Sequence, residues 1–155
     1  MAVFFTGKYE AKMDAKGRVF IPSCYRKALS AENGEAISVQ KDLKMDCLVF
    51  FPEEVWNKRL EKIIDQLDEW DNEDNNETLV NYMADVNRFD IDSQGRILLP
   101  KKIQESIFLE DNEVIFIGMA NRFTLWSKAH FEKIKMPREK LSDNLNKRMK
   151  KSDNE

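Results

Sequence analysis

A ten-residue pattern occurs twice in this chain, and this repeat limits what the chain can fold into. The first copy, MDAKGRVFIP, covers residues 13–22, and the second copy, IDSQGRILLP, covers residues 91–100. Aspartate, glycine, arginine and proline stand at matching positions while the other positions differ. The repeat predicts that one local structure is built twice, in two related halves of the chain.

The residues around each copy predict a strand, a turn, a second strand and a helix. Segments before each aspartate alternate apolar and polar side chains, which is the period of a half-buried strand. Short aliphatic or β-branched runs follow each arginine and favour a second strand. Pro22 and Pro100 suit the start of a helix, where a missing N–H leaves no partner unsatisfied. The predicted strands lie at 7–13, 19–21, 86–91 and 97–99, and the predicted helices at 22–30 and 100–108.

After the predicted helix, the sequence of each half predicts two more strands and an amphipathic helix. Strands are predicted at 36–40, 47–51, 113–119 and 122–126, followed by amphipathic helices at 52–64 and 127–136. Each half is too small to bury a large core alone, so we expect the halves to complete one another. Between them we expect a helix, a polar turn at DNEDNN (residues 71–76) and a second helix.

These signals divide the chain into four predicted parts. They are a first β-rich unit at residues 5–52, a helical acidic linker at 53–82, a second β-rich unit at 83–127, and a C-terminal helix with a basic tail at 128–155. Trp70, among acidic residues of the linker, is predicted to pack between neighbouring subunits. The tail, with Lys147, Arg148, Lys150 and Lys151, is expected to be a frayed helix or disordered.

Composition excludes several classes of protein. Apolar residues make up 42% of the chain and charged residues 34%, which is typical of a globular domain. The apolar runs are far shorter than the roughly 18–20 residues of a membrane span. The only cysteines, Cys24 and Cys47, lack CxxC-type spacing, so we expect small buried side chains rather than disulfides or a metal site. The opening residues do not resemble a secretion signal, and a cytoplasmic location is expected.

The charge is unevenly distributed along the chain. The net charge is −3, yet residues 53–92 alone hold thirteen acidic residues against four basic ones. The first 29 residues carry six basic residues against two acidic ones. A basic surface for phosphate groups can therefore coexist with an acidic region elsewhere.

The residue types that the two copies share have different explanations. Gly17 and Gly95 can supply the positive φ of a tight turn. Asp14 and Asp92 can accept hydrogen bonds from backbone N–H groups of the same turn. Arg18 and Arg96 can pair with those aspartates, either simply to close the turn or to direct a guanidinium into a DNA groove.

The first copy has more basic neighbours than the second. Lys12, Lys16 and Arg18 surround the first turn, and Arg26 and Lys27 follow in the adjoining helix, whereas the second helix has Gln104 and Glu105 at the matching positions. We therefore expect the first copy to read DNA and the second mainly to complete the fold.

The doubled D-x-x-x-R-[VIL]-x-[IL]-P pattern, together with CLVFFPEEVW and NRFTLWS, resembles the MraZ family of bacterial transcriptional regulators over about residues 5–134. The resemblance implies a mostly β (α+β) fold, in which tandem AbrB-like swapped-hairpin halves form one pseudo-twofold β-barrel, accompanied by short amphipathic helices. It implies a ring-shaped homo-oligomer that binds direct repeats in promoter DNA, including the promoter of its own division and cell-wall cluster, as a repressor in the cytoplasm and nucleoid.

The resemblance also implies roles for individual residues. Double-stranded DNA would be contacted by Arg18, Lys16, Lys12, Arg26, Lys27 and Arg96, and the turns would be oriented by Asp14, Gly17, Asp92 and Gly95. The chain departs from many relatives in lacking basic residues from Asn75 to Asn87. No cofactor, metal, membrane or small-molecule substrate is expected.

Other functions are less well supported by the residues. The only histidine, His130, is expected to have a structural role, so an enzyme is not predicted. DIDSQG imitates the start of a calcium loop, but the twelfth position is Lys101 instead of glutamate. Most of the aromatic residues are expected in the core rather than on a surface that stacks nucleobases. An AbrB-like antitoxin or a protein-interaction scaffold without promoter specificity stays as the alternative.

Overall fold

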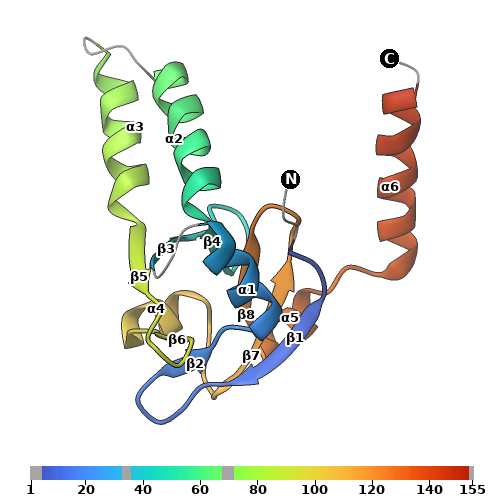
Figure 1. The fold of residues 1–155 in the computed structure, drawn as a ribbon. Coiled ribbons are helices and arrows are strands. Elements are labelled where there is room, and N and C mark those ends of the chain that lie inside the picture. Colours follow the sequence, from blue (N-terminus) through green and yellow to red (C-terminus); the bar gives the residue numbers. More distant parts are fainter. Residues whose placement is uncertain (1–4, 33–35, 68–71, 154–155) are drawn as a thin grey trace.

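Both halves of the sequence repeat fold into the same series of elements (Figure 1). The structure is a computed structural model that describes residues 5–32, 36–67 and 72–153. The first half contains β1 (Lys8–Lys12), β2 (Arg18–Phe20), α1 (Ser23–Glu32), β3 (Ala36–Lys41), β4 (Leu48–Phe51) and α2 (Glu53–Leu67). The second half contains β5 (Val86–Asp90), β6 (Arg96–Leu98), α4 (Lys101–Ser106), β7 (Glu113–Gly118), β8 (Phe123–Ser127) and α5 (Lys128–Ile134). Two further helices, α3 (Glu73–Ala84) and α6 (Arg138–Asp153), have no counterpart in the repeat.

The strands interlock across the two halves. Six of them form one sheet in the order β1-β7-β8-β4-β3-β5, and β2 pairs with β6 in a separate antiparallel ribbon. If each strand is exchanged for its counterpart in the other half, the same strand order is obtained, read from the opposite edge of the sheet. The sheet therefore has a pseudo-twofold axis. Strand β1 pairs with β7 of the second half, and β5 pairs with β3 of the first. The predicted arrangement, in which each half is completed by the other, is therefore confirmed.

The two places where equivalent strands of the halves meet, β2 with β6 and β4 with β8, lie close to the pseudo-twofold axis. Val19 faces Ile97 in the ribbon, and Leu48 faces Leu125 where β4 meets β8. All four side chains are buried in one core, so the ribbon packs onto the six-stranded sheet. Strands β1 and β5 are the sheet's edges, and among the described strands they are not hydrogen-bonded to each other. The result is a barrel-like body that the ribbon completes by packing.

An aromatic cluster from both halves lies in this core. The ring of Phe123 lies 4.7 Å from Tyr25, 4.9 Å from Phe50 and 5.2 Å from Phe5, measured between ring centroids. Burial raises the pKa of Tyr25 to about 12, and its hydroxyl donates a hydrogen bond to the Gly7 carbonyl (3.0 Å). Because three of these rings come from the first half and one from the second, neither half could form this cluster alone.

The remaining predictions about buried side chains have mixed outcomes. Phe51, Trp56 and Trp126 are buried in a second cluster, as expected. Cys47 is also buried, whereas Cys24 is exposed on α1, contrary to expectation. The short helix α1 covers the core with one face, and Tyr25 and Leu29 occupy that face while Cys24 lies outside it. Trp70 lies outside the described residues.

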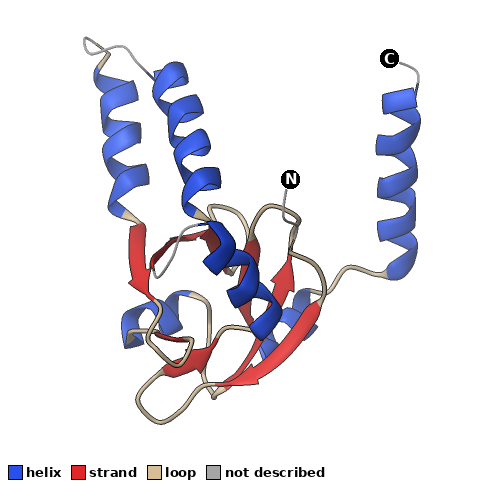
Figure 2. Ribbon diagram, in the orientation of Figure 1, coloured by secondary structure: helices blue, strands red, loops and turns tan. Residues whose placement is uncertain are grey.

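Helices α2, α3 and α6 project from the body (Figure 2). Helices α2 and α3 run side by side as a hairpin, whose base is held by Trp56 stacked on Tyr82 (6.4 Å) and by Arg59 Nε donating to the Tyr82 hydroxyl (2.8 Å). Helix α6 leaves the opposite side of the body (Figure 1). Within the described part of the chain, no helix is long and apolar enough to cross a membrane.

The polar turn predicted at DNEDNN is wrong, because most of these residues belong to α3. The side chain of Asn72 caps the helix by accepting a hydrogen bond from the Asn75 N–H (3.0 Å). Glu73 and Asp74 follow in the first turn, where the helix dipole favours acidic side chains. Asparagine and acidic residues are typical of turns, but they are equally typical of helix N-termini.

Candidate nucleic-acid interface

The first turn, between β1 and β2, is organised by the carboxylate of Asp14. Its Oδ1 accepts hydrogen bonds from the backbone N–H groups of Lys16 (2.9 Å) and Arg18 (2.9 Å). Its Oδ2 accepts a bond from Arg18 Nε (2.7 Å), so the predicted aspartate–arginine pair is present. Gly17 has a φ of +89°, which explains why glycine stands there. The carboxylate thus closes the turn and orients the arginine at once.

The second turn, between β5 and β6, repeats this geometry. Asp92 Oδ1 accepts bonds from the N–H groups of Gln94 (2.9 Å) and Arg96 (2.8 Å), and Oδ2 accepts one from Arg96 Nε (2.8 Å). Gly95 has a φ of +85°. Two turns in one chain therefore hold two guanidinium groups in the same way.

The β2–β6 ribbon carries both arginines on its exposed face. Arg18 lies opposite Leu98, and Phe20 lies opposite Arg96, while the middle residues of both strands point into the core. The guanidinium of Arg96 lies over the ring of Phe20, with 5.8 Å to the centroid. Its side chain is 19% exposed, against 35% for Arg18. Arg18 is thus the more accessible of two equivalent groups.

Phe20 and Leu98 are part of this face, and sequence reasoning did not single them out. They are 51% and 54% exposed, which is unusual for large apolar side chains. The signal was present in RVF and RIL, where alternation along a strand places the first and third residues on the same face. The exposed ribbon therefore combines two cationic and two apolar side chains.

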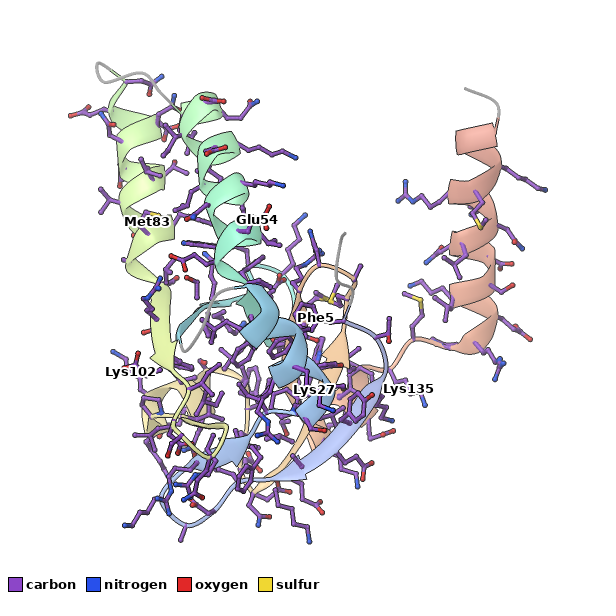
Figure 3. The ribbon with its side chains drawn as sticks, in the orientation of Figure 1. Phe5, Lys27, Glu54, Met83, Lys102 and Lys135 are labelled. Carbon is purple, nitrogen blue, oxygen red and sulfur yellow. The ribbon has the colours of Figure 1, made fainter. Side chains whose placement is uncertain are left out.

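The other predicted basic residues are only partly brought together. Lys12 ends β1 and Lys16 lies in the first turn, both exposed, so they accompany Arg18. Lys27 is exposed on α1, and Lys102 on α4, as Figure 3 shows.

The position of Arg26 differs from the one expected, because its guanidinium lies against the second turn instead of the first. Its Nε donates to the Ile21 carbonyl (3.0 Å), and its Nη1 lies 3.4 Å from the Gln94 carbonyl. A Cβ atom added at Gly95 would collide with this guanidinium. Arg26 therefore adds its charge to the second turn, which reduces the predicted difference between the two copies.

The way in which β2 and β6 cross explains why Arg26 lies beside the second turn. The Ile21 N–H donates to the Gly95 carbonyl (3.0 Å), and the Leu99 N–H donates to the Gly17 carbonyl (2.8 Å). The end of each ribbon strand is thus joined to the turn of the other half, and the following helix comes with it. Gln104, the counterpart of Arg26, donates to the Leu99 carbonyl (2.7 Å) and lies beside Gly17.

The turns give a prediction about pH. The hydrogen bond from the Arg18 backbone N–H is the main reason that the pKa of Asp14 lies below its ordinary value of 3.8, and Arg96 acts in the same way on the pKa of Asp92. A lowered folded pKa stabilises the protein above the unfolded pKa, and this stabilisation is lost as pH falls through the folded pKa. The double variant Asp14→Asn with Asp92→Asn should therefore unfold at lower urea than wild type at pH 7.

This difference in urea midpoint should begin to shrink near pH 4, where the unfolded carboxyls become protonated, and should continue to shrink as pH falls through the lowered pKa values of the folded Asp14 and Asp92 carboxyls, which then become uncharged like asparagine. Urea unfolding at pH 7, 5, 4 and 3 would measure it, with Glu139→Gln combined with Asp143→Asn on the exposed α6 as the control for losing two negative charges. A difference that stays constant from pH 7 to pH 3 would contradict the assigned role of the two carboxylates.

His130 has the structural surroundings expected from the sequence. Its Nε2 lies 2.8 Å from Asp46 Oδ2, and its ring stacks on Phe108 with centroids 4.7 Å apart. These contacts fix α5 against neighbouring loops. The histidine lies on α5, away from the two turns in the sequence and in the strand order.

Comparisons with known proteins match the two structural halves. The family model described as "MraZ protein, putative antitoxin-like" matches the chain twice, over residues 4–81 and 83–153. Together the matches cover most of the sequence. The chain belongs to the MraZ family. The two MraZ matches meet at Tyr82, near the end of α3, shortly before β5 begins the strand series of the second half.

Individual MraZ relatives are similar over most of their length. A protein of Bacteroides fragilis named "Transcriptional regulator MraZ" is 39% identical over 132 residues, which cover 85% of this chain and 82% of the relative. Proteins with the same name from Bacteroides thetaiotaomicron and Carboxydothermus hydrogenoformans are 38% and 39% identical, and cover 83% and 80% of this chain and 81% of each relative.

Proposed function

We propose that this chain is a sequence-specific DNA-binding transcriptional regulator. It binds direct repeats in promoter DNA, including the promoter of its own division and cell-wall cluster, and acts there as a repressor. The observation that carries the proposal is the exposed β2–β6 ribbon with its two pre-oriented arginines. The names of the MraZ relatives support the same class of function.

The chemistry of the ribbon suits a DNA groove. A two-stranded ribbon fits the width of the major groove, and a guanidinium can donate two hydrogen bonds to the edge of guanine. Arg18, already held by Asp14, would lose little conformational freedom on binding. Arg96 would make the equivalent contact from the second half, with less of its side chain exposed.

The remaining basic residues would bind the DNA backbone. Lys12 and Lys16 flank the first turn, Lys27 is exposed on α1, and Arg26 lies beside the second turn. Phosphate contacts fix the position of a protein on DNA but do not read its sequence. We assign the reading of bases to Arg18 and Arg96, and backbone binding to the four others.

Direct repeats require several copies of this surface. We propose that the chains form a ring-shaped homo-oligomer, in which successive subunits contact successive repeats. Once one subunit is bound, its neighbours act at high effective concentration, so weak single contacts give strong binding overall. The protein would act in the cytoplasm, on the nucleoid, with residues 5–52 and 83–127 as its two DNA-binding units.

A titration distinguishes this function from a scaffold or an antitoxin. Fluorescence anisotropy would compare a duplex carrying the direct repeats from upstream of the protein's own gene with a scrambled duplex of the same composition. We expect at least about 10³-fold tighter binding to the repeats. Affinity should also fall steeply with salt, by a slope of about 0.9 per phosphate contact on logarithmic axes. Equal affinity for both duplexes would contradict the proposal and favour the alternative.

A further inference from the structure

Helix α6 carries an apolar stripe that no described residue of the same chain covers. Leu141, Leu145 and Met149 follow one another at four-residue spacing and are 48%, 53% and 65% exposed. Residues 132–150 are exposed throughout, and the helix stands apart from the body in Figure 3. An isolated helix of this length is marginal in water, so a partner that covers the stripe would stabilise it.

Arginines lie on the same face of α6 as the apolar stripe. By helical spacing, Arg138 and Arg148 lie along the line of Leu141 and Leu145, whereas Lys140 and Lys147 lie on the opposite face. The face to be covered is therefore apolar with a positive charge towards each end. A partner for it should be apolar and acidic.

The outer face of α3 has this composition. Tyr82 turns towards α2 and stacks on Trp56, which leaves the opposite face of α3 outward. Glu73, Glu77, Val80 and Met83 lie along that face and are exposed, with 67% for Val80 and 40% for Met83. α3 contains three acidic residues and no basic one. Its outer face is thus complementary to that of α6 in charge and in apolar content.

We propose that α6 of one chain packs on the outer face of α3 of a second copy of the chain. Within one chain the two helices stand on opposite sides of the body, separated by it in Figure 1, so the contact is intermolecular. A contact between two different surfaces leaves one of each kind unused at the ends, so further chains can add, and a ring forms where the rotation between neighbours closes. The inference rests on the proposed ring and names the surfaces that would form it.

Charge reversal in two separate variants tests this contact in the full-length protein. The first variant combines Arg138→Glu with Arg148→Glu, and the second combines Glu73→Arg with Glu77→Arg. The matched control combines Lys140→Glu with Lys147→Glu, which changes the charge of α6 equally on its opposite face. Light scattering would measure the mass of each protein and of an equal mixture of the first two variants.

We expect wild type and the control to have a multiple of the chain mass of 18.3 kDa, and each of the first two variants to fall to 18.3 kDa. The mixture should regain the wild-type mass, because every reversed surface then meets a complementary one. Rescue by mixing also shows that both variants are folded.

Several results would overturn the inference. If the Arg138→Glu, Arg148→Glu variant keeps the wild-type mass, α6 does not form the contact. If that variant alone dissociates, α6 pairs with something other than α3, such as a second α6. If the control dissociates equally, overall charge is responsible. In all three cases wild type is still an oligomer and the ring stands, whereas a wild type at 18.3 kDa would also remove the ring from the proposed function.

Discussion

Replacing Arg18 with alanine is expected to abolish detectable binding to direct-repeat promoter DNA. A bidentate arginine–guanine contact contributes about 1–3 kcal/mol, which is about fivefold to 150-fold in affinity for each subunit on the DNA. Several subunits would lose the contact together, so the losses multiply. Arg96→Ala should have a smaller effect, because the Arg96 side chain is the less exposed of the two.

The fold should survive the Arg18→Ala substitution. The Arg18–Asp14 pair lies at the surface, where ion pairs contribute little to stability, and the backbone bonds of the turn do not involve the guanidinium. Anisotropy and urea unfolding would be measured on the same preparations. Arg88→Ala is the matched control, since Arg88 is an exposed arginine outside both turns that pairs with Glu53 (3.7 Å). Unchanged DNA affinity in Arg18→Ala would remove Arg18 from the interface.

Replacing Phe123 with alanine should cause the largest loss of stability, about 3–5 kcal/mol. The side chain is fully buried and its ring contacts Phe5, Tyr25 and Phe50 of the other half. Removing the ring leaves a cavity at the junction of the two halves, which the rigid sheet around it cannot fill. Both halves should therefore unfold together, in one transition at lower urea.

Urea unfolding followed by circular dichroism, at a fixed protein concentration, would measure this loss. Phe20→Ala is the control, because Phe20 is 51% exposed and its removal leaves no buried cavity. It should cost less than about 1 kcal/mol. A loss of similar size in both variants, or two separate transitions in Phe123→Ala, would show that the halves do not share this core.

Much of this fold could be predicted from the sequence because local rules and the repeat agree. Gly17 and Gly95 indicated turns with positive φ, and Asp14 and Asp92 indicated carboxylates that accept backbone bonds, as both turns show. Alternation before each turn predicted β1 and β5. The small size of each half predicted a shared core. Each of these inferences depends on residues close together in the chain or on simple limits of size.

What could not be predicted depends on contacts between distant residues. Arg26 follows the first copy in sequence but lies beside the second turn, because the strands cross to the other half. The start of α3 was missed because Asn72 and the acids after it suit a turn and a helix N-terminus equally. The separation of α6 from the body, which makes its apolar stripe available, has no local signal at all.

The most direct test of the account is to measure affinity as the number of direct repeats in the duplex is varied. Duplexes of equal length with one, two or three intact repeats would be titrated with wild type at one salt concentration. The account predicts that the second repeat tightens binding by about 10²-fold or more, because a neighbouring subunit then binds intramolecularly. Affinity that is the same for one, two and three repeats would contradict it.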